Sequence, residues 1–106
     1  MAISLETAKM QYEFAVAAMN QTKDEFIDLM RLISEVNVTR AERDMVGDSA
    51  MELAPMLDML KALEPNDVVT HLIGARLNVL FRLELLQRIE LYRILVARYV
   101  RRVPAW

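Results

Sequence analysis

The chain of 106 residues contains no cysteine, two glycines and three prolines, and each shortage excludes certain folds or chemical sites. Without cysteine, a disulfide framework, a zinc–thiolate site and a thiol nucleophile are all excluded. So few glycines and prolines leave too few turns for a β-sandwich or a β-barrel. The frequent residues, Leu, Ala, Met, Glu and Arg, are good helix formers. The composition therefore predicts an all-α protein.

We expect no secretory leader, and the sequence contains no long apolar run. The first residues, MAISLETAKMQYEF, contain no basic region followed by an apolar core. No stretch approaches the roughly 20 apolar residues that a transmembrane helix needs. With 55% hydrophobic and 26% charged residues, the chain has the composition of an ordered protein. We therefore expect a soluble, cytoplasmic protein with no transmembrane segment.

We expect one helical domain over residues 1–106, because a chain of this length holds no more than one hydrophobic core. Hydrophobic periodicity and helix-breaking residues divide the domain into three parts. These parts are a long helix over about 4–36, short helical segments over about 40–64 and a long helix over about 67–103.

The first long helix begins at Ser4, which can cap it. A rival interpretation breaks this helix at the stretch NQTKDE, where Thr22 and Glu25 form a capping-box pattern. One continuous helix is favoured, because a heptad-like apolar stripe keeps its phase across that stretch and Thr22 is its only polar member. The stripe consists of Leu5, Ala8, Tyr12, Ala15, Met19, Thr22, Phe26, Leu29, Ile33 and Val36.

The connecting part contains several helix signals. Gly47 interrupts it, and Ser49 with Glu52 offers a second capping box. Pro55 either kinks the helix that starts there or lies near the start of a shorter helix that ends before Pro65. Four of the eight methionines fall in this part, where they more often fill a core than form an adaptable binding surface.

The last helix follows Pro65 and can be capped by Asn66 or Asp67. At about 1.5 Å per residue it would be roughly 55 Å long. A compact domain of this size has a radius of gyration of only about 13 Å. The predicted fold is therefore an elongated helical hairpin, in which two long amphipathic helices lie side by side, joined by one or two short helices. We expect oligomerisation to complete a bundle.

The last helix carries apolar residues on two sides. One helical partner needs a single apolar stripe, so a helix that is apolar on two sides must be covered twice or expose an interface. The first helix can cover one side and the short segments only part of the other, which predicts a homo-oligomer, a dimer or higher. The smaller set comprises Ile73, Leu77, Leu80, Leu91 and Leu95. The main stripe, our candidate interface, comprises Phe81, Leu85, Ile89, Tyr92, Val96, Tyr99 and Val103.

Charge is distributed unevenly along the chain. Residues 1–67 hold 6 Lys and Arg against 13 Asp and Glu, whereas residues 68–106 hold 7 Arg against 2 Glu. Such halves attract each other first and outside partners second. A nucleic-acid partner is disfavoured, because the net charge is −2 and no recognised nucleic-acid-binding module is present. A possible basic patch for a protein partner consists of Arg88, Arg98, Arg101 and Arg102.

The residues that usually carry catalysis form no recognisable group. The single histidine, His71, has no acid or nucleophile at a telling spacing. Asp44, Asp48 and Glu52 could share one helix face, and a solvated acidic face is the favoured interpretation over a cation site. With two glycines there is no phosphate-binding loop. We therefore expect no enzymatic activity, no cofactor and no metal.

The stretch EPNDVV, followed by a long amphipathic helix, resembles the carboxy-terminal helix of inner-rod and needle subunits in bacterial type III secretion systems. The resemblance implies a small helical protein that polymerises or is held by a helical chaperone.

The favoured function is a non-catalytic helical assembly or adaptor protein that acts through protein–protein contacts and self-association. Two alternatives stay open. One is a small subunit or chaperone of a bacterial secretion apparatus, of the inner-rod or needle type. The other is a regulator that binds nucleic acid through its arginine-rich last helix.

Overall fold

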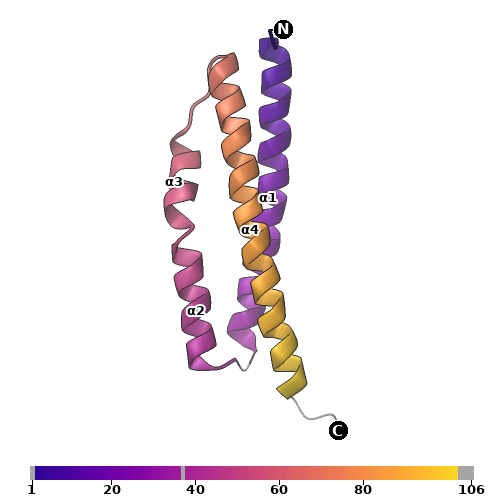
Figure 1. Ribbon diagram of the computed structural model, residues 1–106, viewed down its shortest axis with the longest axis vertical. Coiled ribbons are helices and arrows are strands. Elements are labelled where there is room, and N and C mark those ends of the chain that lie inside the picture. Colours follow the sequence, from indigo (N-terminus) through magenta and orange to yellow (C-terminus); the bar gives the residue numbers. More distant parts are fainter. Residues whose placement is uncertain (1, 37, 103–106) are drawn as a thin grey trace.

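The computed structural model describes residues 2–36 and 38–102, with the side chains of the last helix described as far as residue 98. The described residues form four helices and no strand. The rod measures 62 × 25 × 19 Å, with a radius of gyration of 17.5 Å. The predicted elongated all-α fold is confirmed. The helices are α1 (Leu5–Glu35), α2 (Arg40–Met51), α3 (Ala54–Ala62) and α4 (Val68–Arg102) (Figure 1).

The two long helices, α1 and α4, lie side by side and run in the same direction (Figure 1). Thr22 contacts Arg82 and Phe26 contacts Tyr92, so residue numbers rise together along both helices. A parallel pair needs a connection as long as the helices themselves. Helices α2 and α3, here called the return arm, supply it by carrying the chain back along the rod.

Helix α1 is continuous through residues 20–25, as predicted, and begins at its expected cap. The Ser4 hydroxyl oxygen accepts a hydrogen bond from the Thr7 backbone N–H at 3.1 Å. At the suspected break, the Thr22 hydroxyl donates a hydrogen bond to the Ala18 carbonyl of the preceding turn, at 3.0 Å. Thr22 is 4% exposed, so this bond satisfies a polar group that the stripe would otherwise bury unpaired.

The predicted interruption at Gly47 and the capping box at Ser49 are wrong, because α2 runs through both positions. Its capping box lies earlier. The Thr39 hydroxyl oxygen accepts from the Glu42 backbone N–H, and the Glu42 carboxylate accepts from the Thr39 backbone N–H. Both signals have the same Ser/Thr-x-x-Glu form, and only the earlier one stands at the start of a helix.

The structure decides between the two interpretations of Pro55 and confirms the helix end before Pro65. Pro55 lies in the first turn of α3, where its missing N–H removes no intrahelical hydrogen bond. Helix α3 ends at Ala62, before Pro65. Asp67 then caps α4, since its carboxylate accepts a hydrogen bond from the Thr70 backbone N–H at 2.8 Å. That bond lowers the pKa of Asp67.

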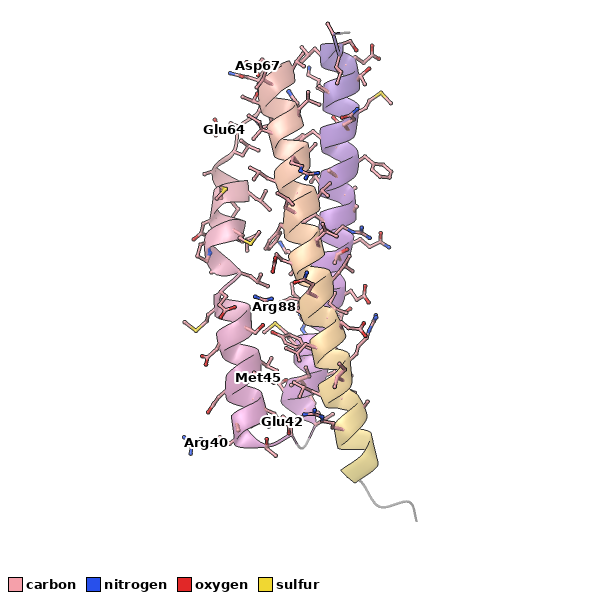
Figure 2. All side chains as sticks on the ribbon, in the orientation of Figure 1. Arg40, Glu42, Met45, Glu64, Asp67 and Arg88 are labelled. Carbon is pink, nitrogen blue, oxygen red and sulfur yellow. The ribbon has the colours of Figure 1, made fainter. Side chains whose placement is uncertain are left out.

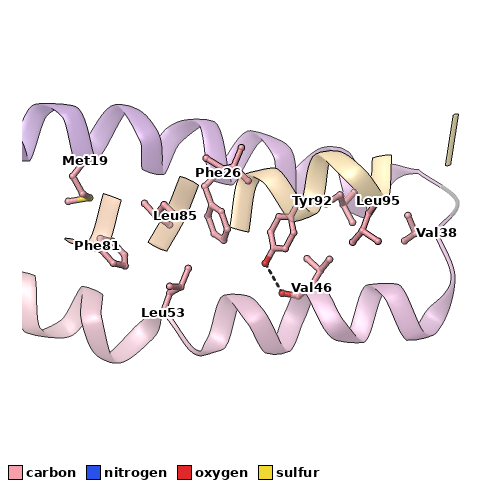
Figure 3. Packing of buried hydrophobic residues seen from close by; sticks show 11 residues of the cluster. Met19, Phe26, Val38, Val46, Leu53, Phe81, Leu85, Tyr92 and Leu95 are labelled. Carbon is pink, nitrogen blue, oxygen red and sulfur yellow. Dashed lines mark hydrogen bonds between the residues drawn. The ribbon is translucent and has the colours of Figure 1, made fainter. Parts of the chain in front are cut away.

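The hydrophobic core is one cluster along the seam between α1, α4 and α2 (Figure 3). Helix α3 contributes no fully buried residue, and the arm places Val46 of α2 and Leu53, which lies between α2 and α3, in the core. The side chains that are less than 2% exposed and largest by volume are Tyr92, Ile33, Leu85, Ile89 and Leu95.

The two glycines of the chain meet opposite surroundings. At Gly74, an added Cβ would lie 2.7 Å from Leu63 Cδ2 and 2.7 Å from Tyr12 Cε2, so α4 approaches its neighbours closely there. At Gly47, an added Cβ would have no heavy atom within 4 Å. Both residues are helical, so alanine brings the same gain in helix propensity to each.

Gly47→Ala should therefore raise the free energy of unfolding by about 0.5–1 kcal/mol, whereas Gly74→Ala should lower it by about 1–3 kcal/mol through overpacking. Urea unfolding followed by circular dichroism measures both. The first variant is the control for helix propensity. Equal stabilisation by both substitutions would show that α4 does not approach Tyr12 and Leu63 closely.

Candidate protein-binding groove

The stripe of α4 that the sequence offers as an interface lies mainly inside a single chain. Val96 is partly buried and packs against the core. Tyr99 and Val103 carry side chains that lie outside the described residues. A second molecule that docks on this conformation would not reach the buried part of the stripe. Its members, each at most 2% exposed, are Phe81, Leu85, Ile89 and Tyr92.

Tyr92 connects three helices at the centre of this stripe (Figure 3). Its hydroxyl donates a hydrogen bond to the Val46 carbonyl of α2 at 3.0 Å. Its ring packs at a tilt against Phe26 of α1, with 5.4 Å between centroids. The side chain is fully buried, and this burial raises the pKa of Tyr92. The neutral phenol is therefore the form that the folded state prefers.

The smaller apolar set on α4 is covered only in part, as expected. Leu95 is 1% exposed and belongs to the core. Met56, Met59 and Leu60 of α3 line a small cavity together with Leu77 and Leu80 of α4. Ile73 stays 48% exposed and Leu80 stays 40% exposed. The return arm therefore shields this side loosely, with flexible side chains.

Of the four arginines predicted as a basic patch, the two whose side chains are described, Arg88 and Arg98, have different surroundings. Arg88 points towards the return arm and pairs with Glu52 at 2.9 Å and with Glu84 at 3.4 Å (Figure 2). The Arg88 side chain is 21% exposed, and its ion pair with Glu52 connects α4 to the middle of the return arm. Arg98 is exposed, and the side chains of Arg101 and Arg102 lie outside the described residues.

The acidic and basic parts of the chain attract each other within the rod. Arg93 of α4 pairs with Glu25 of α1, and Arg88 pairs with Glu52. These are the ion pairs that join different helices or arms among the described residues. Each joins an arginine of the basic last helix to a carboxylate of the acidic first part, as the charge distribution predicted.

An open groove of about 710 Å³ runs between the first halves of α1 and α4. No residue of the return arm lines it, so it lies on a face of the α1–α4 pair that the arm leaves uncovered. Phe14 is 79% exposed and Met10 63% exposed, on the α1 side. We call it the outer groove and define it by Met10, Phe14, Ala18, Leu72, Val79 and Leu83.

Polar bonds close the lower end of the outer groove. The Arg82 Nε donates to the Thr22 hydroxyl oxygen at 2.9 Å, and the Arg93–Glu25 ion pair follows. Beyond that pair a second hollow of about 240 Å³ continues between the same two helices, lined partly by Leu29 and Leu32. The uncovered face therefore has a mainly apolar upper part that also holds the exposed Arg76, a charged crossing, and a smaller part in which Leu29 and Leu32 lie beside Asp28.

The sequence reasoning missed the outer groove because it followed one stripe on each helix. Met10 and Phe14, four residues apart, lie beside the main stripe of α1 rather than in it. Leu72, Val79 and Leu83, spaced by seven and four, do the same on α4. These spacings mark a second apolar face on each helix, and they are the signal that could have predicted the groove.

The described part of the chain shows no arrangement suited to metal binding. No group of three or more His, Asp or Glu side chains within it could hold a metal ion. His71 is buried, with Nδ1 2.6 Å from the Asp67 carbonyl oxygen and its ring edge-on to Tyr12. Over residues 2–36 and 38–102, no helix has the length and apolar character needed to cross a membrane.

Comparisons with protein-family models, with curated proteins and with solved structures found no match to this chain. The outer groove is therefore interpreted from its own shape and chemistry.

Replacing Tyr92 tests its central role. Tyr92→Phe removes one buried hydrogen bond and should cost about 0.5–1.5 kcal/mol, whereas Tyr92→Ala should cost about 3–5 kcal/mol through the cavity it leaves. Urea unfolding at neutral pH measures both. Similar small losses for the two variants would show that the site is not tightly packed.

The raised pKa of Tyr92 also predicts a pH dependence. A folded-state pKa above the unfolded value of about 10 gives stability that is fully present below that pH. This contribution is lost as pH rises through the folded-state pKa. Wild type should therefore lose more stability than Tyr92→Phe between pH 9 and 11 (roughly one unit on each side of that value). Parallel losses in urea titrations would contradict this assignment.

Proposed function

We propose that the protein is a non-catalytic helical adaptor or assembly protein of the cytoplasm, which binds an apolar helical surface of another chain at the outer groove. One observation carries the proposal. The groove exposes Phe14 by 79% and Leu83 by 49% on the face of the α1–α4 pair that the return arm leaves open.

A groove between two packed helices is the shape that a further helix fills. Helices α1 and α4 already form one side of a bundle, and the return arm covers their seam from one direction. A helical surface placed in the outer groove would cover the seam from the other direction, so that the α1–α4 pair would lie between the return arm and the partner. Contiguous exposed apolar surface of this kind marks an interaction site rather than ordinary scatter.

The charges near the groove favour a protein partner over nucleic acid. Nucleic-acid binding depends on cations that are available to phosphate groups. Arg82 is bound to Thr22 and Arg93 is paired with Glu25, which leaves the exposed Arg76 as the groove arginine with no partner among the described residues. One such cation is too few to hold a phosphate backbone. The apolar upper part of the groove, by contrast, offers carbon surface with no bound partner in the described chain.

Capture of partners from the native cells tests the proposal. The full chain carries an affinity tag in three forms: wild type, Phe14→Glu and Met51→Glu. Met51 is 74% exposed at the end of α2, outside the groove, so it is a matched control for adding a carboxylate to an exposed apolar position. Circular dichroism should show equal helix content in all three forms.

We expect one or more proteins to be retained by wild type and by Met51→Glu and to be lost with Phe14→Glu. Unchanged retention by Phe14→Glu would contradict a binding role for the groove. Retained nucleic acid that is released by moderate salt would instead support the regulator alternative.

A further inference from the structure

We infer that the surface bound at the outer groove is the outer groove of a second copy, with the two copies parallel about a two-fold axis along the rod. This inference rests on the proposed function, because it names the partner of the same site. The width of the apolar face, its area and the order of polar and apolar levels along it support it.

The exposed apolar side chains lie on the crests of both helices as well as between them. Met10 and Phe14 are exposed on α1, and Val79 and Leu83 are 41% and 49% exposed on α4. A single short helix in the groove would cover its floor and leave one or both crests in water. A face two helices wide is covered by another face two helices wide, which a second α1–α4 pair supplies.

The area of the uncovered face suits a stable dimer. It extends along α1 from Thr7 to Leu32, which is about 37 Å at about 1.5 Å per residue. Two helices packed side by side are about 20 Å wide. The face therefore offers about 750 Å² per copy, close to the roughly 800 Å² per partner of a standard interface.

The direction of the second copy follows from the levels along the rod. The apolar upper part holds Phe14 and Val79, and the charged crossing holds Glu25 and Arg93. A two-fold axis along the rod places each level against the same level of the partner. A two-fold axis across the middle of the face would place the Arg93–Glu25 ion pair against the apolar part, which removes water from both charges without adding a polar contact.

The net charges of the two long helices favour the same direction. Helix α1 contains 3 Lys and Arg against 6 Asp and Glu, whereas α4 contains 7 Arg against 2 Glu. With the axis along the rod, each acidic α1 lies on the basic α4 of the other copy. With the axis across the rod, α1 lies on α1 and α4 lies on α4, so that charges of the same sign face each other. Helix dipoles favour the crosswise axis with only about half a charge at each helix end, which is less than these whole charges.

Cysteine cross-linking distinguishes the two directions, because the chain has no cysteine of its own. Gln11 and Leu29 both line the uncovered face. They are 18 residues apart, about five turns and 27 Å, so they lie on the same side of α1. Gln11→Cys, Leu29→Cys and the control Ala41→Cys on α2 are each treated with a short bis-maleimide. Ala41 is exposed on the return arm.

In the parallel arrangement, Gln11→Cys and Leu29→Cys should each form cross-linked dimers alone, and Ala41→Cys should not. Cross-links that form only when the Gln11→Cys and Leu29→Cys proteins are mixed would overturn the parallel arrangement. Equal cross-linking of Ala41→Cys would show random collision and would also overturn it.

Light scattering at micromolar concentration measures the association itself. Wild type and Met51→Glu should scatter as twice 12.3 kDa. Phe14→Glu should raise the dissociation constant at least about 30-fold, as loss of an interfacial aromatic anchor does. A dimer that survives Phe14→Glu unchanged, or a mass that grows beyond two copies, would overturn a closed dimer at this face.

A monomeric wild type would overturn the second copy as partner, and the capture experiment then separates the two proposals. If Phe14→Glu still loses a protein that wild type retains, the adaptor function stands with a different partner. If it loses none, the function proposed for the groove fails as well.

Discussion

The parallel packing of α1 against α4 determines the rest of the architecture. Two parallel helices need a connection that travels back along their whole length, so α2 and α3 form a return arm beside them. One arm covers the α1–α4 seam from one direction only. The opposite face therefore stays open, and the outer groove is the consequence of the chain's own path rather than of a local insertion.

Both buried contacts and ion pairs stabilise this arrangement of helices. Tyr92 reaches α2 through Val46 and α1 through Phe26, so a single side chain connects the arm to the helix pair. Aligned dipoles of α1 and α4 oppose parallel packing by a fraction of a charge at each end. The Arg93–Glu25 pair and the Thr22–Arg82 bond join the two helices and oppose that repulsion. The charge asymmetry of the sequence thus acts first within one molecule.

Much of the fold was predictable because it depends on local chemistry. Ser4, Pro55 and Asp67 mark helix starts through bonds within one turn, and the unbroken stripe across Thr22 predicted a continuous α1. The start of the short segments near residue 40 was predicted correctly, but a further helix start was wrongly expected at Ser49, because two capping boxes of the same form lie ten residues apart and only their surroundings distinguish them. The sequence could not show that α1 and α4 are parallel, because two helices of similar length use similar apolar stripes in parallel and in antiparallel packing.

The candidate site was likewise predictable only in part. The sequence by itself determined that α4 is apolar on more sides than one helix can cover, because residue spacing defines the faces of a helix. Only the tertiary structure decided which face becomes core. Tyr92 and Leu85 were predicted to face a partner and lie inside one chain, whereas Phe14 and Leu83 lie in the open. The path of the return arm decided which face is buried. Residue spacing within a single helix cannot show where a distant segment will pack.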